Sequence, residues 1–382
     1  MATPFEEPVY AVAGRMLSLR DLLAVFNDPA HMVDGISRFS DLHLKTGEAA
    51  FYRYDGDIVP LRDGTVMRPE VVELFVGALL TPEQFERLHA APPVDIDASF
   101  AWPAGGLSFR LNAFRDRDGL AAVVRVLPRL IPSLESLGLP DSRVAQEICD
   151  LQQGLVIVAG NTGSGKSTTI ASFLQHINAR RNVRIITLED PVEHVFGSRR
   201  ALFSQRELGL HIPTFSAGLR SALREDPDII FVGEMRDAET TALALTAAET
   251  GHLVFSTLHT RDAKGTVSRI VDLFPPERTK EIASQLSLSL SYVISQKLVA
   301  RRTGGRRLAV EVLKNTAGVA HLVRTGAWHQ LYTQLETGHN DGMITLEHHL
   351  HALVRTGEIT PEEARRNANE PQVIDRLLLP PP

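Results

Sequence analysis

One segment of the sequence combines glycines, a lysine and a hydroxyl in a spacing that suits phosphate binding. The run Gly160-Asn161-Thr162-Gly163-Ser164-Gly165-Lys166-Ser167 fits the pattern G-x-x-x-x-G-K-[ST]. The glycines let backbone N–H groups turn toward phosphates, Lys166 reaches the β- and γ-phosphates, and the Ser167 hydroxyl ligates Mg²⁺. An apolar run at 155–159 precedes the motif, and a helical pattern follows it from Ser167 to about Asn178. We therefore predict an ATP- and Mg²⁺-binding loop that ends at Thr168.

Carboxylates follow two further apolar runs and could act on the same phosphates. The run Ile229–Val232 ends in Gly233-Glu234, as a Walker B strand does, so Glu234 could join the Mg²⁺ shell or orient the attacking water. Three more acids, Glu189, Asp190 and Glu193, follow the run at 184–188. Parallel sheets bind ligands at the carboxyl ends of their strands, so these acids should face the same cleft. The residues leave open whether Glu234 or Glu189 is the catalytic base.

Two histidines flank a fourth apolar run at residues 253–257. His259 follows its carboxyl end and could sense or orient a γ-phosphate, whereas His252 precedes the run. A lone histidine beside a strand more often has a structural role, and the residues alone favour that interpretation for both.

The elements that must position these residues follow from the apolar periodicity. Four buried runs alternate with helical patterns, which is typical of a parallel, helix-covered sheet in an α/β domain over residues 146–370, and its part after about Pro276 is predicted to be mostly helical. Before it, residues 36–128 alternate strand and helix patterns and predict a small α+β domain. Residues 129–145, rich in proline, are predicted to be a linker. Residues 1–35 are interpreted as a leader and residues 371–382 as a tail.

Composition excludes several classes of protein. The chain has 382 residues, a net charge of −6 and one cysteine, which excludes a multi-cysteine zinc site. No apolar run approaches the roughly 20 residues that span a bilayer, so we expect a cytoplasmic protein. The acidic balance argues against sequence-independent binding of nucleic acid.

The four motifs, in this order, resemble the type II/type IV secretion and pilus ATPase family, and within it the PilT-type branch. The resemblance covers roughly residues 35 to 365. It is carried by Ser221-Ala222-Leu223-Arg224-Glu225-Asp226-Pro227-Asp228, by Gly233-Glu234-Met235-Arg236-Asp237 and by Thr246-Ala247-Ala248-Glu249-Thr250-Gly251-His252.

The resemblance implies a PAS-like N-terminal domain, a RecA-like P-loop ATPase domain with a helical C-terminal part, and a homohexamer with ATP at subunit contacts. It implies that Glu189, Asp190 and Glu193 form an acidic box, that His252 and His259 form a histidine box, and that Arg110 and Arg125 complete the site. It further implies a motor that drives pilus retraction and twitching motility, works on an inner-membrane platform protein, and is peripheral at the inner membrane.

The sequence departs from the family pattern at several places, and alternatives stay open. Asn161 stands where the family usually has proline, and the retraction-specific segment appears in altered form at residues 318–326. The alternatives are a DotB-like type IV secretion ATPase and an assembly ATPase, whose usual tetracysteine zinc module the single cysteine excludes. A nucleic-acid translocase is disfavoured by the acidic pI and by the lack of a basic or aromatic stacking motif.

Overall fold

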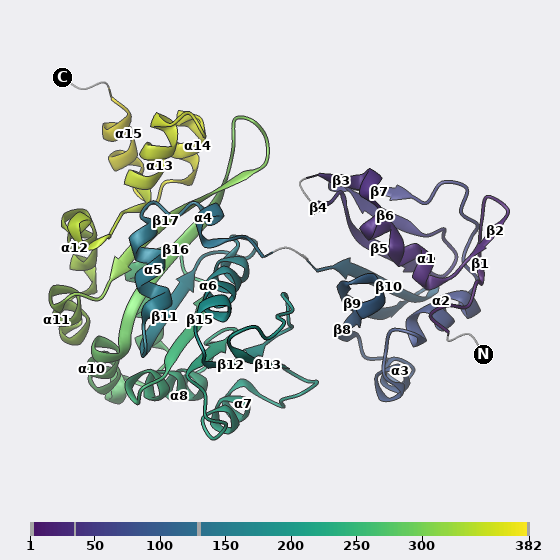
Figure 1. Cartoon of the computed structure of the whole chain (residues 1–382), viewed down its shortest axis with the longest axis horizontal. Helices are drawn as coiled ribbons and strands as arrows, with labels where there is room; N and C mark the ends of the chain where they lie inside the picture. Colours follow the sequence, from purple (N-terminus) through teal and green to yellow (C-terminus); the bar gives the residue numbers. More distant parts are fainter. Residues whose placement is uncertain (1–3, 34–35, 128–130, 380–382) are drawn as a thin grey trace. The chain divides into compact units, whose positions relative to one another are not determined.

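The computed structural model describes residues 4–33, 36–127 and 131–379. The chain divides close to residue 130 into two compact units, which are coloured purple to blue and teal to yellow in Figure 1. Nothing in the described part of the chain forms a helix long and apolar enough to cross a membrane.

The N-terminal unit is built on a six-stranded antiparallel sheet with the strand order β7-β6-β5-β10-β9-β8. Its main elements are β1 (Tyr10–Val12), β2 (Arg15–Leu17), α1 (Leu19–Ala24), β3 (Met32–Val33), β4 (Ile36–Ser37), β5 (Phe39–Lys45), β6 (Phe51–Tyr54), β7 (Asp57–Pro60), α2 (Pro69–Gly77), α3 (Pro82–Leu88), β8 (Ile96–Trp102), β9 (Leu107–Asp116) and β10 (Gly119–Val126).

The two faces of this sheet differ because side chains alternate along each strand. On β9, Phe109 and Leu111 are fully buried and pack in one core with Phe75 of α2. Arg110 lies between them in sequence and therefore projects from the opposite face. The apolar alternation thus covers one face of the sheet with helices and leaves the arginines on the other.

The described part of the predicted leader, residues 4–33, does not form a separate segment. Its elements β1, β2 and α1 belong to the N-terminal unit, and Leu19, Leu22 and Leu23 are buried in the core of that unit. Helix α1 begins with a capping box, in which the Ser18 hydroxyl accepts from the Asp21 amide at 3.2 Å and the Asp21 carboxylate accepts from the Ser18 amide at 2.9 Å.

The C-terminal unit is built on a seven-stranded sheet with the order β13-β12-β14-β15-β11-β16-β17, parallel except for β17. Its strands are β11 (Gly154–Ala159), β12 (Arg184–Glu189), β13 (Leu202–Glu207), β14 (Ile229–Val232), β15 (Leu253–Leu258), β16 (Leu290–Ala300) and β17 (Arg306–Lys314). Its α-helices are α4 (Leu134–Leu137), α5 (Ser142–Asp150), α6 (Lys166–Arg180), α7 (Phe215–Ala222), α8 (Ala238–Glu249), α9 (Ala263–Asp272), α10 (Thr279–Ser289), α11 (Ala317–Thr325), α12 (Leu331–Thr337), α13 (Leu346–Arg355), α14 (Pro361–Asn367) and α15 (Pro371–Leu378).

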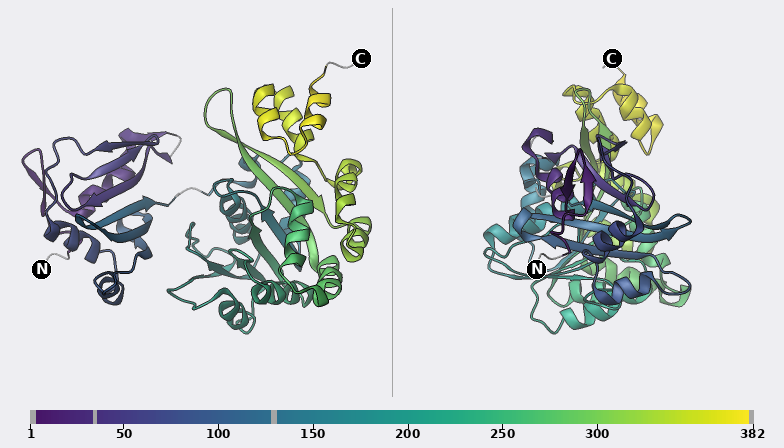
Figure 2. Two further views of the ribbon diagram at one scale, coloured as in Figure 1. Left: turned by 180° about the vertical axis from the view of Figure 1, so that it is seen from behind. Right: turned by 90° about the vertical axis from the view of Figure 1, so that its right-hand side faces the viewer.

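Helices cover both faces of this sheet, and the left view of Figure 2 shows helices on either side of its strands. On β11, Leu155 and Ile157 pack with α7 to α12, while Val156 and Val158 pack with α4 to α6. A strand buried on both faces requires the continuous apolar run that the sequence shows here. Helices α13 to α15 form a further layer against the distal part of the β16–β17 hairpin.

Two segments contain elements that the sequence did not predict. Residues after Pro276 include the long hairpin β16–β17 as well as helices, because an apolar run of this kind fits a buried strand and a buried helix equally well. The predicted linker at 129–145 contains α4 and the start of α5, whose Leu134 and Val144 are buried in the C-terminal unit. The first two residues of the predicted linker, 129 and 130, lie outside the described residues.

Candidate nucleotide-binding and catalytic site

The phosphate loop lies where the motif requires it, between β11 and α6. Gly163 and Gly165 have φ angles of 78° and 88°, and Gly165 caps the N-terminus of α6. Only glycine adopts this left-handed conformation at little cost, so the two residues allow the chain to curl around an anion. The helix begins at Lys166, which places a positive dipole end beside the loop.

Lys166 is held inside the curl of this loop. Its ammonium donates to the carbonyls of Gly160 at 2.8 Å and Asn161 at 3.1 Å, and the residue is only 8% exposed. Asn161, Thr162 and Gly163 line the rim and are exposed. A buried cation bonded to carbonyls is ready to exchange them for phosphate oxygens.

Ser167 and Thr168 occupy the first turn of α6, and both are half-buried. Mg²⁺ takes oxygen ligands, and the Ser167 hydroxyl together with the Glu234 carboxylate supplies oxygens of that kind. Strands β11 and β14, which precede the phosphate loop and Glu234, both flank β15, so their carboxyl ends lie at one edge of the sheet. The residues present therefore fit the predicted ion.

Glu189 ends β12 as a buried, fixed carboxylate. Its Oε1 accepts from the Thr187 hydroxyl at 2.6 Å and from the Gln205 amide at 3.0 Å. The residue is 6% exposed. Glu193 lies exposed in the loop that follows β12. Of the three acids in this segment, Glu189 is thus oriented by its neighbours and Glu193 faces solvent.

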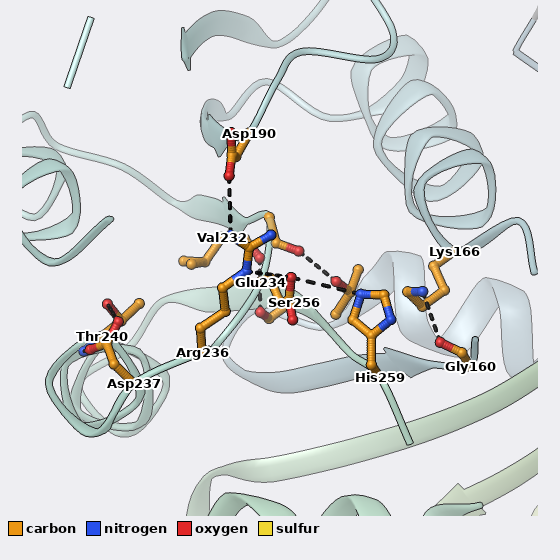
Figure 3. A network of polar contacts seen from close by, with 12 residues as sticks. Gly160, Lys166, Asp190, Val232, Glu234, Arg236, Asp237, Thr240, Ser256 and His259 are labelled. Carbon is orange, nitrogen blue, oxygen red and sulfur yellow. Dashed lines mark hydrogen bonds and ion pairs between the residues drawn. The ribbon is translucent and has the colours of Figure 1, made fainter. Parts of the chain in front are cut away.

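Glu234 follows β14 and is the centre of a charged cluster (Figure 3). Its Oε2 accepts from Arg236 Nε at 2.7 Å and lies 3.7 Å from Nε2 of His259. Arg236 also donates to Asp190 at 3.2 Å. The hydrogen bond to Glu234 raises the pKa of the Arg236 guanidinium above its ordinary value. The cluster therefore ties the ends of β12, β14 and β15 together.

The two histidines lie at opposite ends of β15. His259 follows the carboxyl end and joins the Glu234 cluster, whereas the Nδ1 atom of His252 lies 3.0 Å from the carbonyl of Ala247 before the strand begins. A six-residue strand separates them by about 20 Å. Within one chain, His252 is therefore not brought to the phosphate loop, contrary to its predicted place among the nucleotide-binding residues.

Arg110 and Arg125 are direct cross-strand neighbours in the N-terminal unit. They pair in the register of β9 and β10, which puts both on one face of the sheet. Arg125 donates to the buried carboxylate of Asp41 at 2.7 Å, and its side chain is 61% exposed. Two cationic side chains thus lie side by side on this face, one of them held by a buried carboxylate.

Sequence reasoning gave no role to three residues of the C-terminal site. Arg236 lies two residues beyond Glu234 and bridges it to Asp190. Gln205 holds Glu189, and Gln296 contacts the phosphate loop from β16. Arg236 could have been found from its spacing, since i and i+2 residues after a strand end can share a cleft. The two glutamines come from strands that carry no motif.

The phosphate loop, the Walker B acid and the acidic strand end define a P-loop ATPase. The chain belongs to the type II/IV secretion system protein family, whose model matches residues 37–366.

The chain is 43% identical to the type IV pilus retraction ATPase PilT of Pseudomonas aeruginosa, over 87% of this chain and 95% of that protein. It resembles the crystal structure of the pilus retraction motor PilT with bound ADP with a TM-score of 0.82 at 40% identity, covering 88% of this chain and 95% of the other. The ATPase DotB of Legionella pneumophila is less similar, with a TM-score of 0.76 at 28% identity, over 86% and 91% of the two chains.

Proposed function

We propose that this chain hydrolyses ATP to drive retraction of a type IV pilus, as a homohexamer at the cytoplasmic face of the inner membrane that works on a platform protein. The observation that carries the proposal is the convergence of Lys166, Glu234 and His259 at one sheet edge. The chain is 43% identical to a retraction ATPase over most of both lengths, and this similarity supports retraction as the direction of force.

The reaction is transfer of the γ-phosphoryl group to water. The water oxygen forms a bond to phosphorus, the bond to the β–γ bridging oxygen breaks, and the water proton passes to a carboxylate and then to solvent. Glu234 fits this role better than Glu189, because Glu189 is buried and already accepts two hydrogen bonds. Glu234 is 19% exposed, and Arg236 restrains it at the open edge of the site.

The remaining side chains supply and balance charge. Lys166 neutralises the β- and γ-phosphates, and His259 beside Glu234 can contact the γ-phosphate or the departing phosphate. When bound at Ser167 and Glu234, Mg²⁺ supplies further charge neutralisation. Arg110 and Arg125 add two more cations if the N-terminal sheet of one subunit meets the nucleotide of another.

A gene deletion tests the direction of force. We expect the deletion strain to keep or gain surface pili while twitching stops, and to regain twitching with the native gene but not with Lys166→Ala. Absence of pili would assign the motor to pilus assembly. Normal twitching with blocked protein export would assign it to secretion of the DotB kind. A purified protein that stays monomeric with an ATP analogue, by light scattering, would contradict the hexamer.

A further inference from the structure

The floor of the phosphate loop is made by β16, a strand that carries none of the motifs. Gln296 of this strand is 2% exposed, and its amide nitrogen donates to the carbonyl of Ser164 at 2.7 Å. Strand β16 runs parallel to β11, with Ser295 opposite Ala159, the last residue before the loop. Gln296 is therefore the first residue of β16 beyond the paired region, directly under the glycine-rich curl.

The loop also approaches the backbone of Gln296 too closely for any side chain to intervene. A Cβ atom at Gly160 would lie 2.5 Å from the backbone carbonyl oxygen of Gln296, and one at Gly165 would lie 3.3 Å from the Nε2 atom of the Gln296 side chain. Gly160 is thus required by the packing of β16 as well as by the curl, and a side chain at Gly165 would crowd the Gln296 side chain.

The hydrogen bond between Gln296 and Ser164 fixes the direction in which the N–H group of Gly165 points. The carbonyl of Ser164 and the N–H of Gly165 belong to one planar trans peptide and point in opposite directions. Holding the carbonyl on Gln296 therefore aims the Gly165 N–H away from β16, toward the inside of the loop. The Oε1 atom of the Gln296 side chain is buried and has no hydrogen-bond partner among the described residues. The hydrogen bond that orients this side chain is therefore the one from its amide nitrogen to the Ser164 carbonyl.

We propose that Gln296 is a positioning residue that keeps the phosphate loop in its binding-competent curl. The inference rests on the proposed nucleotide site and adds to it a residue that does not touch the nucleotide. Without the Gln296 donor, the buried Ser164 carbonyl is unsatisfied and its peptide can rotate, which misdirects one phosphate-binding amide.

The test compares Gln296→Met, which keeps volume and removes the donor, with Ser295→Ala on the same strand. Ser295 is a matched control, because its buried hydroxyl has no hydrogen-bond partner within the described ranges. The probes are ADP in calorimetric titration and ATP in steady-state kinetics. We expect Gln296→Met to weaken ADP binding and raise KM on the order of tenfold with kcat near the native value. Ser295→Ala should bind as the native protein does.

Gln296→Glu supplies a second readout, which a merely structural role would not move. A charged carboxylate cannot donate to Ser164, but a protonated one can, so the ADP affinity of this variant relative to the native protein should recover as pH falls toward 5.

Native ADP affinity in Gln296→Met, or a lower kcat with unchanged KM and ADP affinity, would overturn the role of Gln296. So would a Gln296→Glu variant whose relative affinity does not change with pH. Failure of the native protein itself to bind ADP would instead overturn the nucleotide site, and with it this inference.

Discussion

The two sets of residues expected to act on ATP differ in how completely the chain has built them. At the C-terminal sheet edge, Lys166 and Glu189 are buried and already bonded to neighbours that set their orientation. On the N-terminal sheet, Arg125 is largely exposed and its partner is the carboxylate of Asp41. The first set is organised for phosphates before they arrive. The second set presents cations on a surface and needs another surface to bring phosphates to them.

This difference has a consequence for catalysis. Preorganised groups in a buried site do not have to reorient during the reaction, so their removal should affect both binding and chemistry. Exposed arginines contribute only when the nucleotide and the N-terminal sheet meet, which makes their contribution conditional. A motor can use such a condition to couple domain movement to hydrolysis.

The largest effect is expected for the buried lysine. Lys166→Ala removes the cation at the β- and γ-phosphates, and we expect ATPase activity to fall to background, on the order of 10³-fold or more. Phosphate release from the purified protein measures it. Lys280→Ala on the exposed surface of α10 is the control and should keep native activity. Native turnover in Lys166→Ala would mean that the loop is not the catalytic centre.

The arginines test whether the second set acts across a subunit contact. Arg110→Ala and Arg125→Ala should each lower turnover by about 10³-fold, in the range of other arginines that stabilise a transferring phosphoryl group. An equal mixture of Arg125→Ala and Lys166→Ala subunits should then recover up to about a quarter of native activity, because some contacts in a ring combine two intact halves.

The mixture must be compared with the two separate variants at the same total concentration. Recovery of ATPase activity would show that the exposed arginines act on the nucleotide of a neighbouring subunit, unlike the buried residues of the C-terminal unit. A mixture that is no more active than its components would mean that each arginine serves its own subunit or none.

The acid at the end of β14 is expected to have the next largest effect. Glu234→Gln keeps the shape but removes the base, and we expect kcat to fall by about 10²–10³-fold. ADP binding should change little, because Lys166 and the loop remain, and calorimetric titration checks this. Glu239→Gln at an exposed position of α8 is the control. If Glu189→Gln lowered kcat while Glu234→Gln did not, the base would be Glu189.

The sequence could predict features that depend on residue types within a short segment, but not features that depend on contacts between distant strands. The phosphate loop, Glu234 and the parallel sheet were predicted because they need specific residue types within one short segment, with a strand before and a helix after. The hairpin β16–β17 was not predicted, since its buried strands have the same continuous apolar pattern as a buried helix. The support given by Gln205 and Gln296 depends on strand order, which no local pattern contains.

The N-terminal arginines could not be assigned a role from their own sequence context. Arg110 and Arg125 were assigned from the family resemblance, because each alone is an ordinary charge on a strand. The register of β9 and β10 makes them neighbours, and β5 adds Asp41 beside Arg125. That arrangement joins residues more than 80 positions apart and follows only from the sheet.

The smallest expected effect concerns how Arg125 is held. The Asp41 carboxylate is 2% exposed, accepts from Arg125, and lies 3.8 Å from Arg53, so Asp41→Asn leaves two arginines without their counter-charge. We expect a loss of about 1 kcal/mol in the unfolding free energy of the N-terminal unit, measured by urea denaturation. Asp55→Asn is the control: Asp55 pairs with Arg38 in the same unit, but the pair is exposed, and its loss should not measurably change stability. Asp41→Asn should also raise the KM for ATP a few-fold, because Arg125 must then be ordered when the nucleotide arrives. If Asp41→Asn changed neither stability nor KM, Arg125 would not depend on Asp41, and the N-terminal set would be less organised than the hydrogen bond suggests.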